Sequence, residues 1–270
     1  MTNQPTVFHL THHKAGSQWV AEILKRCAPE RFVLPQIQVA HFLTNPIKIG
    51  GIYPTVYVSR AKFETTLGLR KWSDRQTHRY FFRHPVTFMF NWLHFRLQKR
   101  PYRKFIVIRD LRDTLISLYF SLKISHPQIT SRHVTLRQSL NALDQERGLM
   151  LLMDQIIPGV ADKQLSWLHT PDTLFLKYEH LLADEYTTFQ HIIAYCQIQI
   201  HHQTLSDIIK YNSFESVTGR KRGDEDITLH QRKGIAGDWR NYFSERIKEE
   251  FKRRFGNVLI QTGYERDDNW

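Results

Sequence analysis

The segment Arg232–Gly234 has the residue types that grip a phosphate monoester. The Arg232 guanidinium can donate two parallel hydrogen bonds to phosphate oxygens, and Lys233 adds a second positive charge. Gly234 has no side chain, so a phosphate can come close to the backbone there. Three residues match by chance too often to decide anything, and an exposed basic turn would also explain them. The longer string Arg232–Phe243, RKGIAGDWRNYF, is far less expected by chance than these three residues alone.

A second set of anion-binding residues lies near the N-terminus, in VFHLTHHKAGSQWVAEIL. The pattern predicts a strand, a loop that contains Lys14 and Gly16, and a helix that begins near Ser17. The free amides of the first helical turn and the positive end of the helix dipole would face a phosphate, and Lys14 adds a full charge. The Walker A pattern G-x-x-x-x-G-K-[ST] is missing, so no magnesium-coupled triphosphate site is predicted.

A third segment, KFIVIRDLRDTLISLYF, places Arg109 at the end of a predicted strand and Ser117 on the helix that follows. An arginine at a strand end can bind a phosphate through two hydrogen bonds, while a hydroxyl inside the helix adds a neutral donor. Asp113 is expected to cap this helix, because its carboxylate can accept from the free amides of the first turn. Arg112 is expected on the helix surface.

Taken in order, these segments resemble the cofactor motifs of sulfotransferases that use 3′-phosphoadenosine 5′-phosphosulfate (PAPS). Arg232–Phe243 resembles the family's RKGxxGDWKNxF, and the Lys14 loop resembles PKSGTTW, which holds the 5′-phosphosulfate. The spacing from Arg109 to Ser117 is similar to that of the family's 3′-phosphate motif. Four positions of the loop depart from the family pattern, with a proline, a serine and two threonines replaced by His13, Ala15, Ser17 and Gln18.

Three smaller matches concern the nucleoside. Trp19 stands where the family has a tryptophan near the adenine, and Tyr178 in LKYEHLL resembles the tyrosine of its YEDL segment. The block Asn212-Ser213-Phe214 resembles its TSF. Ordinary packing would also explain Trp19, Tyr178 and Phe214, since large amphipathic rings are common in cores.

Sulfuryl transfer requires a base, and histidine, with an ordinary pKa of about 6.5, suits that role. The family places its base at a strand end in a pattern like RIIKTHLP, and RYFFRHP at Arg79–Pro85 aligns with it to give His84. His78 and His94 are the competitors. The family's lysine two residues before its histidine falls on Phe82, which is a departure on the acceptor side.

The resemblance implies PAPS as co-substrate, adenosine 3′,5′-bisphosphate (PAP) as product, no metal, and transfer to a hydroxyl or an amine. It implies that His84 is the base, that Lys14 stabilises the bridging oxygen of the leaving nucleotide, and that Ser117 holds Lys14 aside until the acceptor arrives. The implied cofactor-binding residues are Lys14, Ala15, Gly16, Ser17, Gln18, Trp19, Arg109, Ser117, Tyr178, Asn212, Ser213, Phe214, Arg232, Lys233 and Gly234.

Short β-rich runs alternate with segments of helical period, which predicts an α/β fold: a mainly parallel central sheet flanked by helices, with a P-loop-like phosphosulfate-binding loop. The predicted strands are Thr6–Leu10, Val56–Ser59, Arg79–Phe82, Lys104–Ile108 and Thr173–Lys177. Helices are predicted after Gly16 and Asp113 and at Leu136–Gln155, Thr187–Cys196, Thr204–Tyr211 and Ser244–Arg254. No linker is evident, so residues 1–270 are expected to form one domain. The polar segment Gly219–Gln231 is expected to be a loop and a mobile lid.

The net charge of +12 indicates an anionic partner without choosing its class. Two cysteines, Cys27 and Cys196, lie in apolar helical patterns, which favours free buried thiols and a reducing compartment. No apolar run is long enough to span a bilayer and the N-terminus lacks a signal-peptide pattern, so a cytoplasmic protein is expected.

Two other classes of function stay open at this point. A nucleotide or small-molecule kinase would share a strand-loop-helix phosphate site, although the missing GK[ST] argues against it. A nucleic-acid-binding module would fit the charge and the 13% aromatic content, but its known sequence patterns are absent and nucleic acid is not expected as a partner.

The acceptor is not fixed by the sequence. Segments Gln36–Arg75 and Ser125–Asp162 occupy the places of acceptor loops, and their composition would suit a small molecule, a lipid or a carbohydrate. The dimer motif KxxxTVxxxE of the soluble family members is not matched, so a homodimer stays an open possibility.

Overall fold

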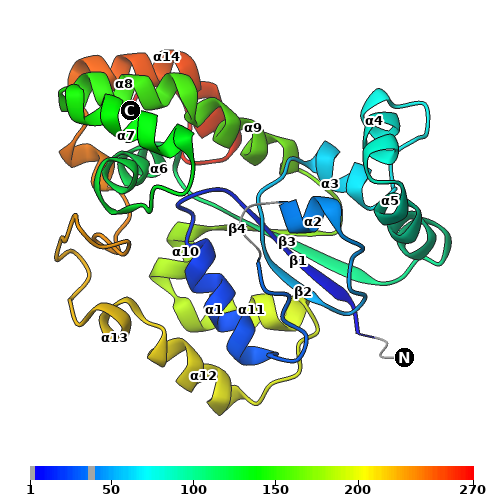
Figure 1. Ribbon diagram of the computed structural model, residues 1–270. Coiled ribbons are helices and arrows are strands. Elements are labelled where there is room, and N and C mark those ends of the chain that lie inside the picture. The colour runs from blue at the N-terminus through cyan, green and yellow to red at the C-terminus, as the bar shows by residue number, and fades with distance from the viewer. Residues whose placement is uncertain (1–3, 36–39) are drawn as a thin grey trace. The chain divides into compact units, whose positions relative to one another are not determined.

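The computed structural model describes residues 4–35 and 40–270 (Figure 1). The chain divides into two compact units, and each is described by itself. The first unit comprises Met1–His12, Gly16–Ile108 and Ser166–Ile209, and the second comprises His13–Ala15, Arg109–Leu165 and Lys210–Trp270. One domain over residues 1–270 therefore stays a prediction.

The first unit is built on a four-stranded sheet in the order β2-β1-β3-β4. All three strand pairs are parallel, and their register sets Phe8 against Tyr53 and Lys104. The strands are β1 (Thr6–Thr11), β2 (Ile52–Val56), β3 (Tyr102–Ile108) and β4 (Thr173–Lys177). The predicted α/β class with a parallel sheet is confirmed.

Successive side chains of β1 point to opposite faces of the sheet, so this unit has apolar packing on both faces. Val7 packs in one apolar cluster with Ile23 and Phe189, whereas Phe8 contacts the rings of Phe63 and Phe95. The first cluster draws on α1 (Ser17–Cys27), α10 (Tyr178–Ala183), α11 (Glu185–Tyr195) and α12 (His202–Tyr211). The remaining elements are α2 (Ala40–Thr44), α3 (Arg60–Thr66), α4 (Arg75–Arg83), α5 (Pro85–Asn91) and the π-helix η1 (Trp92–Leu97). Figure 1 shows α1 and α11 on one side of the strands and α2 and α3 on the other.

Two strand predictions are wrong. The second strand covers Ile52–Val56 instead of Val56–Ser59, because Pro54 lies inside it and masks the strand pattern. The segment Arg79–Phe82 belongs to helix α4, because Asp74 caps that helix by accepting from Gln76 N (2.8 Å) and Thr77 N (3.3 Å). The other three predicted strands are confirmed to within a residue or two.

The second unit is helical. It contains α6 (Leu111–Phe120), the π-helix η2 (Ser121–Ser125), α7 (Ser131–Ala142), α8 (Gln145–Gln155), most of α9 (Ile157–Trp167), α13 (Phe214–Thr218), the 3₁₀-helix η3 (Asp238–Asn241) and α14 (Glu245–Gln261). Its core joins Leu115, Leu149 and Phe251, which are fully buried.

Two helix boundaries in this unit differ from prediction. The single helix expected at Leu136–Gln155 is two helices, because Asp144 caps α8 by accepting from Arg147 N at 2.8 Å. Helix α14 continues to Gln261 instead of ending at Arg254, since Val258 and Leu259 pack into the core one turn farther on.

Cys27 and Cys196 are buried free thiols, as predicted, and burial raises the pKa of each to about 12. Among the described helices, none has the length and apolarity that crossing a bilayer would require.

Candidate functional site

Helix α1 begins at Ser17, as the sequence predicts, and Gly16 is its N-cap. The Gly16 φ of 75° lies in the left-handed region, and a β-carbon there would come within 2.9 Å of the Tyr178 ring. Both observations require glycine at this turn. The Trp19 ring meets Tyr178 edge-on, with centroids 6.4 Å apart, so the structure brings three of the predicted cofactor residues together.

Tyr57 was not singled out from the sequence. It follows β2 directly, and its hydroxyl lies 2.7 Å from Ser17 Oγ, at the first residue of α1. Burial raises the pKa of Tyr57, so its phenol stays protonated near neutrality and can serve as a donor. Gln18, the next predicted residue, is exposed at the same helix start.

His84 does not lie at a strand end. It lies between α4 and α5, where it is the C-cap of α4 and the N-cap of α5. It is half-buried, and its ring centroid is 5.2 Å from that of Tyr80. The strand premise for His84 is therefore wrong, and its role as base stays a prediction. Of its competitors, His78 packs 4.8 Å from the Trp72 ring, and His94 Nδ1 pairs with Gln98 Oε1 at 3.0 Å.

In the second unit, Arg109 joins the lysine loop to the segment after RKG. Its Nη1 donates to the Lys14 carbonyl (3.1 Å) and its Nη2 to the Ile235 carbonyl (3.2 Å). Two predicted anion-binding segments that are far apart in the sequence are thus held by one guanidinium. Gln164 Nε2 in turn donates to the Arg109 carbonyl at 2.7 Å, which fixes the backbone of that residue.

Lys14 has two unusual properties. Its φ of 69° lies in the left-handed region, which is uncommon for a side chain of this kind. Burial, followed by the positive charges of Arg109 and Arg232, lowers its pKa from 10.5 to about 8. No hydrogen bond joins Lys14 to Ser117 in the part of the chain that the structure describes, and Ser117 is partly buried on α6.

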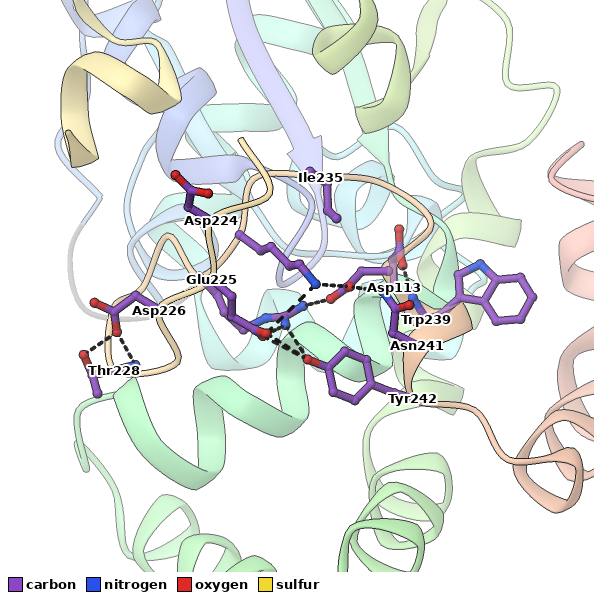
Figure 2. A network of polar contacts seen from close by, with 12 residues as sticks. Asp113, Asp224, Glu225, Asp226, Thr228, Ile235, Trp239, Asn241 and Tyr242 are labelled. Carbon is purple, nitrogen blue, oxygen red and sulfur yellow. Dashed lines mark hydrogen bonds and ion pairs between the residues drawn. The ribbon is translucent and has the colours of Figure 1, made fainter. Parts of the chain in front are cut away.

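Arg232 and Lys233 are held in a network of opposite charges (Figure 2). Arg232 donates to the carboxylates of Glu225 and Asp238, and Lys233 Nζ donates to Asp238 Oδ1 at 2.7 Å. The Tyr242 hydroxyl bonds Glu225 Oε1 at 2.9 Å, as the dashed lines in Figure 2 show. Two cations and two carboxylates therefore balance before any ligand binds.

Gly234 lies over the ring of Phe214. Its φ is 67°, and a β-carbon at this residue would come within 2.6 Å of the ring, so glycine is required. Ser213 caps α13 by accepting from Ser216 N at 3.2 Å, and Asn212 is buried beside it. The predicted Asn212–Phe214 block and the predicted RKG turn therefore pack directly against each other.

Asp113 has a different role from the predicted cap. Asp110 caps α6 by accepting from Arg112 N (2.8 Å), whereas Asp113 accepts from Gly237 N (2.6 Å) and Trp239 N (3.0 Å). The carboxylate thus supports the GDW turn, as Figure 2 shows beside Trp239. Asp113 and Gly237 are 124 positions apart, so no short sequence pattern reveals that they are in contact.

Arg112 is buried instead of lying on the surface. It pairs with Asp110 (2.7 Å) and Glu265 (2.6 Å), and its guanidinium lies over the Trp239 ring at 4.1 Å. Two carboxylates and an aromatic face compensate for the loss of water around the charge.

The loop Gly219–Gln231 is confirmed as a segment without regular structure. It is tied to the RKG turn by two backbone hydrogen bonds, from Gly223 N to the Lys233 carbonyl (2.9 Å) and from Asp226 N to the Arg232 carbonyl (2.8 Å). These two hydrogen bonds hold the part of the loop that contains Glu225 close to Arg232. Movement of the loop as a lid stays a prediction.

The comparisons with known proteins agree with this geometry. The family model described as "Sulfotransferase domain" matches residues 4–263. The chain belongs to the sulfotransferase family. Its relatives include the 3-alpha-hydroxysteroid sulfotransferase of Cavia porcellus, 26% identical over 166 residues that cover 58% of this chain and 55% of that protein. Sulfotransferase 2A1 of Homo sapiens is 23% identical over 92% of this chain and 82% of that protein.

The chain spans about half the length of the first curated relatives that it matches. Among solved structures, mouse sulfotransferase SULT7A1 complexed with PAP has a TM-score of 0.60 at 17% identity, with 98% of this chain and 90% of that chain covered. This likeness establishes the sulfotransferase fold.

A group of histidines in the second unit, which includes His126 and His133, was not singled out from the sequence. The rings of His126 and His133 lie 4.8 Å apart. Desolvation, and then the charges of Lys163, His126 and Lys14, lowers the pKa of His13, although the residue is exposed at the surface. The lowered pKa makes His13 a weaker base than an ordinary histidine.

Proposed function

We propose that this protein transfers a sulfuryl group from PAPS to a hydroxyl or an amine of a small acceptor and releases PAP. The single observation that carries the proposal is the position of the Arg109 guanidinium, which donates to the Lys14 and Ile235 carbonyls and so holds two of the motif segments together. Lys14 and Arg109 thus contribute positive charges at one place, which favours the binding of an anion there. Two phosphates on one nucleotide supply that anion, and membership of the sulfotransferase family supports PAPS as its source.

The proposed cofactor residues keep the roles that the motifs imply. The amides at the start of α1 and the Lys14 charge would hold the 5′-phosphosulfate, while Arg109, Ser117 and the RKG turn would hold the 3′-phosphate. Trp19, Tyr178 and Phe214 would contact the adenosine. The remaining proposed contacts are Ala15, Gly16, Ser17, Gln18, Asn212 and Ser213.

In the proposed reaction, the acceptor oxygen or nitrogen attacks sulfur as a base removes its proton. The bond between sulfur and the bridging oxygen breaks, and its electrons leave on the 5′-phosphate of PAP. Lys14 stabilises this developing charge. Lys14 must be protonated to do so, and its pKa of about 8 in the protein permits this at neutral pH.

The base is proposed to be a histidine. His84 is the candidate from the motif alignment, and His13 is the competitor that the structure adds. One property supports His13: it precedes Lys14 directly. Replacement of each residue separates the two candidates, as discussed below.

The acceptor is proposed to be a small molecule with a hydroxyl group, because the relatives bear the names 3-alpha-hydroxysteroid sulfotransferase and flavonol 3-sulfotransferase. A lipid or a carbohydrate fits the same chemistry. The predicted acceptor segment Gln36–Arg75 lies partly outside the described residues, at 36–39. We also propose a cytoplasmic location, and a homodimer stays open.

The test of this function is transfer of radiolabelled sulfate from PAPS to panels of phenols, sterols, sugars and lipids, with EDTA present. Formation of a labelled product that depends on Lys14 supports the proposal. A requirement for ATP and magnesium would instead support a kinase. Steeply salt-dependent binding to random DNA without turnover of PAPS would support a nucleic-acid-binding module.

A further inference from the structure

The continuous helical segment formed by α5 and η1 is apolar on two faces. Its inner face buries Phe88, Asn91 and Phe95, spaced three and four residues apart, and the Phe95 ring packs against Phe8 of the sheet. Its outer face is apolar too, although a surface helix is normally polar on that side. Packing within this unit therefore accounts for the inner face of the segment but not for its outer face.

The outer stripe consists of five large apolar side chains on α4, α5 and η1: Phe82, Val86, Met89, Leu93 and Leu97. Phe82 and Val86 are the most exposed, at 76% and 75%, and the others are exposed by 42% or more. The spacing of three and four residues places the members on α5 and η1 along one side of that segment. A group of this kind indicates an interaction surface.

Cations are concentrated in the same stretch of the chain as the outer stripe. Residues 70–100 contain eight Lys and Arg and a single carboxylate, Asp74, which is bonded to Arg70. Six of the cations have strongly exposed side chains: Lys71, Arg75, Arg79, Arg83, Arg96 and Lys99. Within the described chain, none of these six forms an ion pair with a carboxylate, and Arg96 donates to the Leu69 carbonyl at 2.7 Å. The charge beside the stripe is thus almost entirely uncompensated.

We propose that the outer stripe and its flanking cations form a surface that docks on an anionic lipid membrane. Apolar side chains of a helix that lies in the plane of the interface enter the acyl boundary, while Lys and Arg meet the lipid phosphates. Trp72, which is 51% exposed beside α4, is an aromatic ring of the type enriched at that boundary. The attachment is peripheral, because the stripe occupies only one face of its helices.

A second copy of this chain is a poorer occupant for the surface. A symmetric dimer contact would set the same patch against itself, so the uncompensated cations of two copies would face one another. Anionic lipid removes this repulsion and also accepts the apolar side chains, which free nucleic acid does not.

The experiment is co-sedimentation of the full chain with vesicles. One set consists of phosphatidylcholine alone, and the other contains about one-third phosphatidylserine, the anionic lipid that cytoplasmic leaflets present. The stripe variant carries Phe82→Ser, Val86→Ser and Leu97→Ser, and the charge variant carries Arg75→Gln, Arg79→Gln and Arg83→Gln. The matched controls are Leu34→Ser with Ile129→Ser, which are exposed apolar positions elsewhere, and Arg132→Gln, Arg147→Gln and Arg253→Gln.

We expect the wild type to bind the anionic vesicles and to leave them as salt increases. The stripe variant should bind at least about tenfold more weakly, and the charge variant should lose roughly fivefold for each cation removed. Both controls should bind like the wild type, and thermal melting should show that all variants are folded. Absence of wild-type binding, or an equal loss in the controls, overturns the proposal. The proposal is also overturned if analytical ultracentrifugation shows a dimer that the stripe variant abolishes while vesicle binding stays unchanged.

Discussion

Lys14 illustrates at the scale of one residue how a functional charge lowers stability. Its pKa is 10.5 ordinarily and about 8 in the folded protein, because it is buried and lies near Arg109 and Arg232. The folded state therefore binds the Lys14 proton more weakly than the unfolded state does. The resulting destabilisation is complete below about pH 8 and disappears as the pH rises toward 10.5. Such a cost is reasonable at a site that is completed by an anion.

Lys14→Met should therefore separate stability from activity. We expect a roughly 10²–10³-fold loss of kcat/KM for PAPS, because the leaving oxygen loses its cation. We also expect a melting temperature a few degrees higher at pH 7, since the buried charge is gone. Calorimetric melts across pH 7–10 check the sign: the wild type should gain stability relative to the variant as pH rises. A variant that is less stable than the wild type at pH 7 would contradict the account.

In the proposed site, Glu225 would compete with an incoming phosphate for Arg232. Glu225→Gln removes one of the two carboxylates that neutralise Arg232 and Lys233, so PAP should bind roughly fivefold more tightly. The matched control is Asp224→Asn, on the same loop, whose carboxylate points away from the network in Figure 2. Titration calorimetry measures both. Weaker PAP binding by the Gln variant would show that Glu225 orders the site.

The base is identified by two alanine variants. Replacement of the true base, His84 or His13, should lower kcat about 10²–10⁴-fold and leave PAP affinity nearly unchanged. His94→Ala is the control, because its ring is engaged with Gln98. The hypothesis of a histidine base at either position fails if both variants retain near-normal kcat.

At the scale of elements, local sequence patterns predicted most of the strands and helices that position the candidate site. Strands β1, β3 and β4 and the start of α1 are predictable because their apolar spacing and turn residues are local. Pro54 concealed β2, and the aromatic run before His84 resembles a strand although Asp74 starts a helix there. Contacts such as Asp113 with Gly237 and Ser17 with Tyr57 join distant segments, so no pattern of spacing reveals them.

Two glycines test whether the RKG turn depends on close packing. Gly234→Ala places a β-carbon 2.6 Å from Phe214, whereas Gly219→Ala, at nearly the same φ, meets nothing within 4 Å. Both should lose about 1–2 kcal/mol of stability from the left-handed backbone. The Gly234 variant alone should also lose at least tenfold in PAP affinity, because Phe214 must move. Equal effects of the two changes in melting and calorimetry would refute close packing as the reason for this glycine.

At the scale of the whole molecule, net charge and local charge differ. The total of +12 indicates an anionic partner, but Arg232 and Lys233 are balanced by Glu225 and Asp238, while the cations beside the outer stripe are not. The sequence supplies the number of charges, and only the fold distributes them. The order of the motifs along the chain, not the charge, is what predicted the sulfotransferase family.

The most direct test of the proposed nucleotide chemistry is titration calorimetry of the protein with PAP, AMP and ATP in the presence of EDTA. The account predicts micromolar binding of PAP, and binding of AMP at least about thirtyfold weaker, because AMP lacks the 3′-phosphate that Arg109 and the RKG turn are proposed to hold. ATP should not compete with PAP. Equal affinity for PAP and AMP, or preference for ATP, would contradict the claim that this chain is built around a 3′-phosphorylated nucleotide.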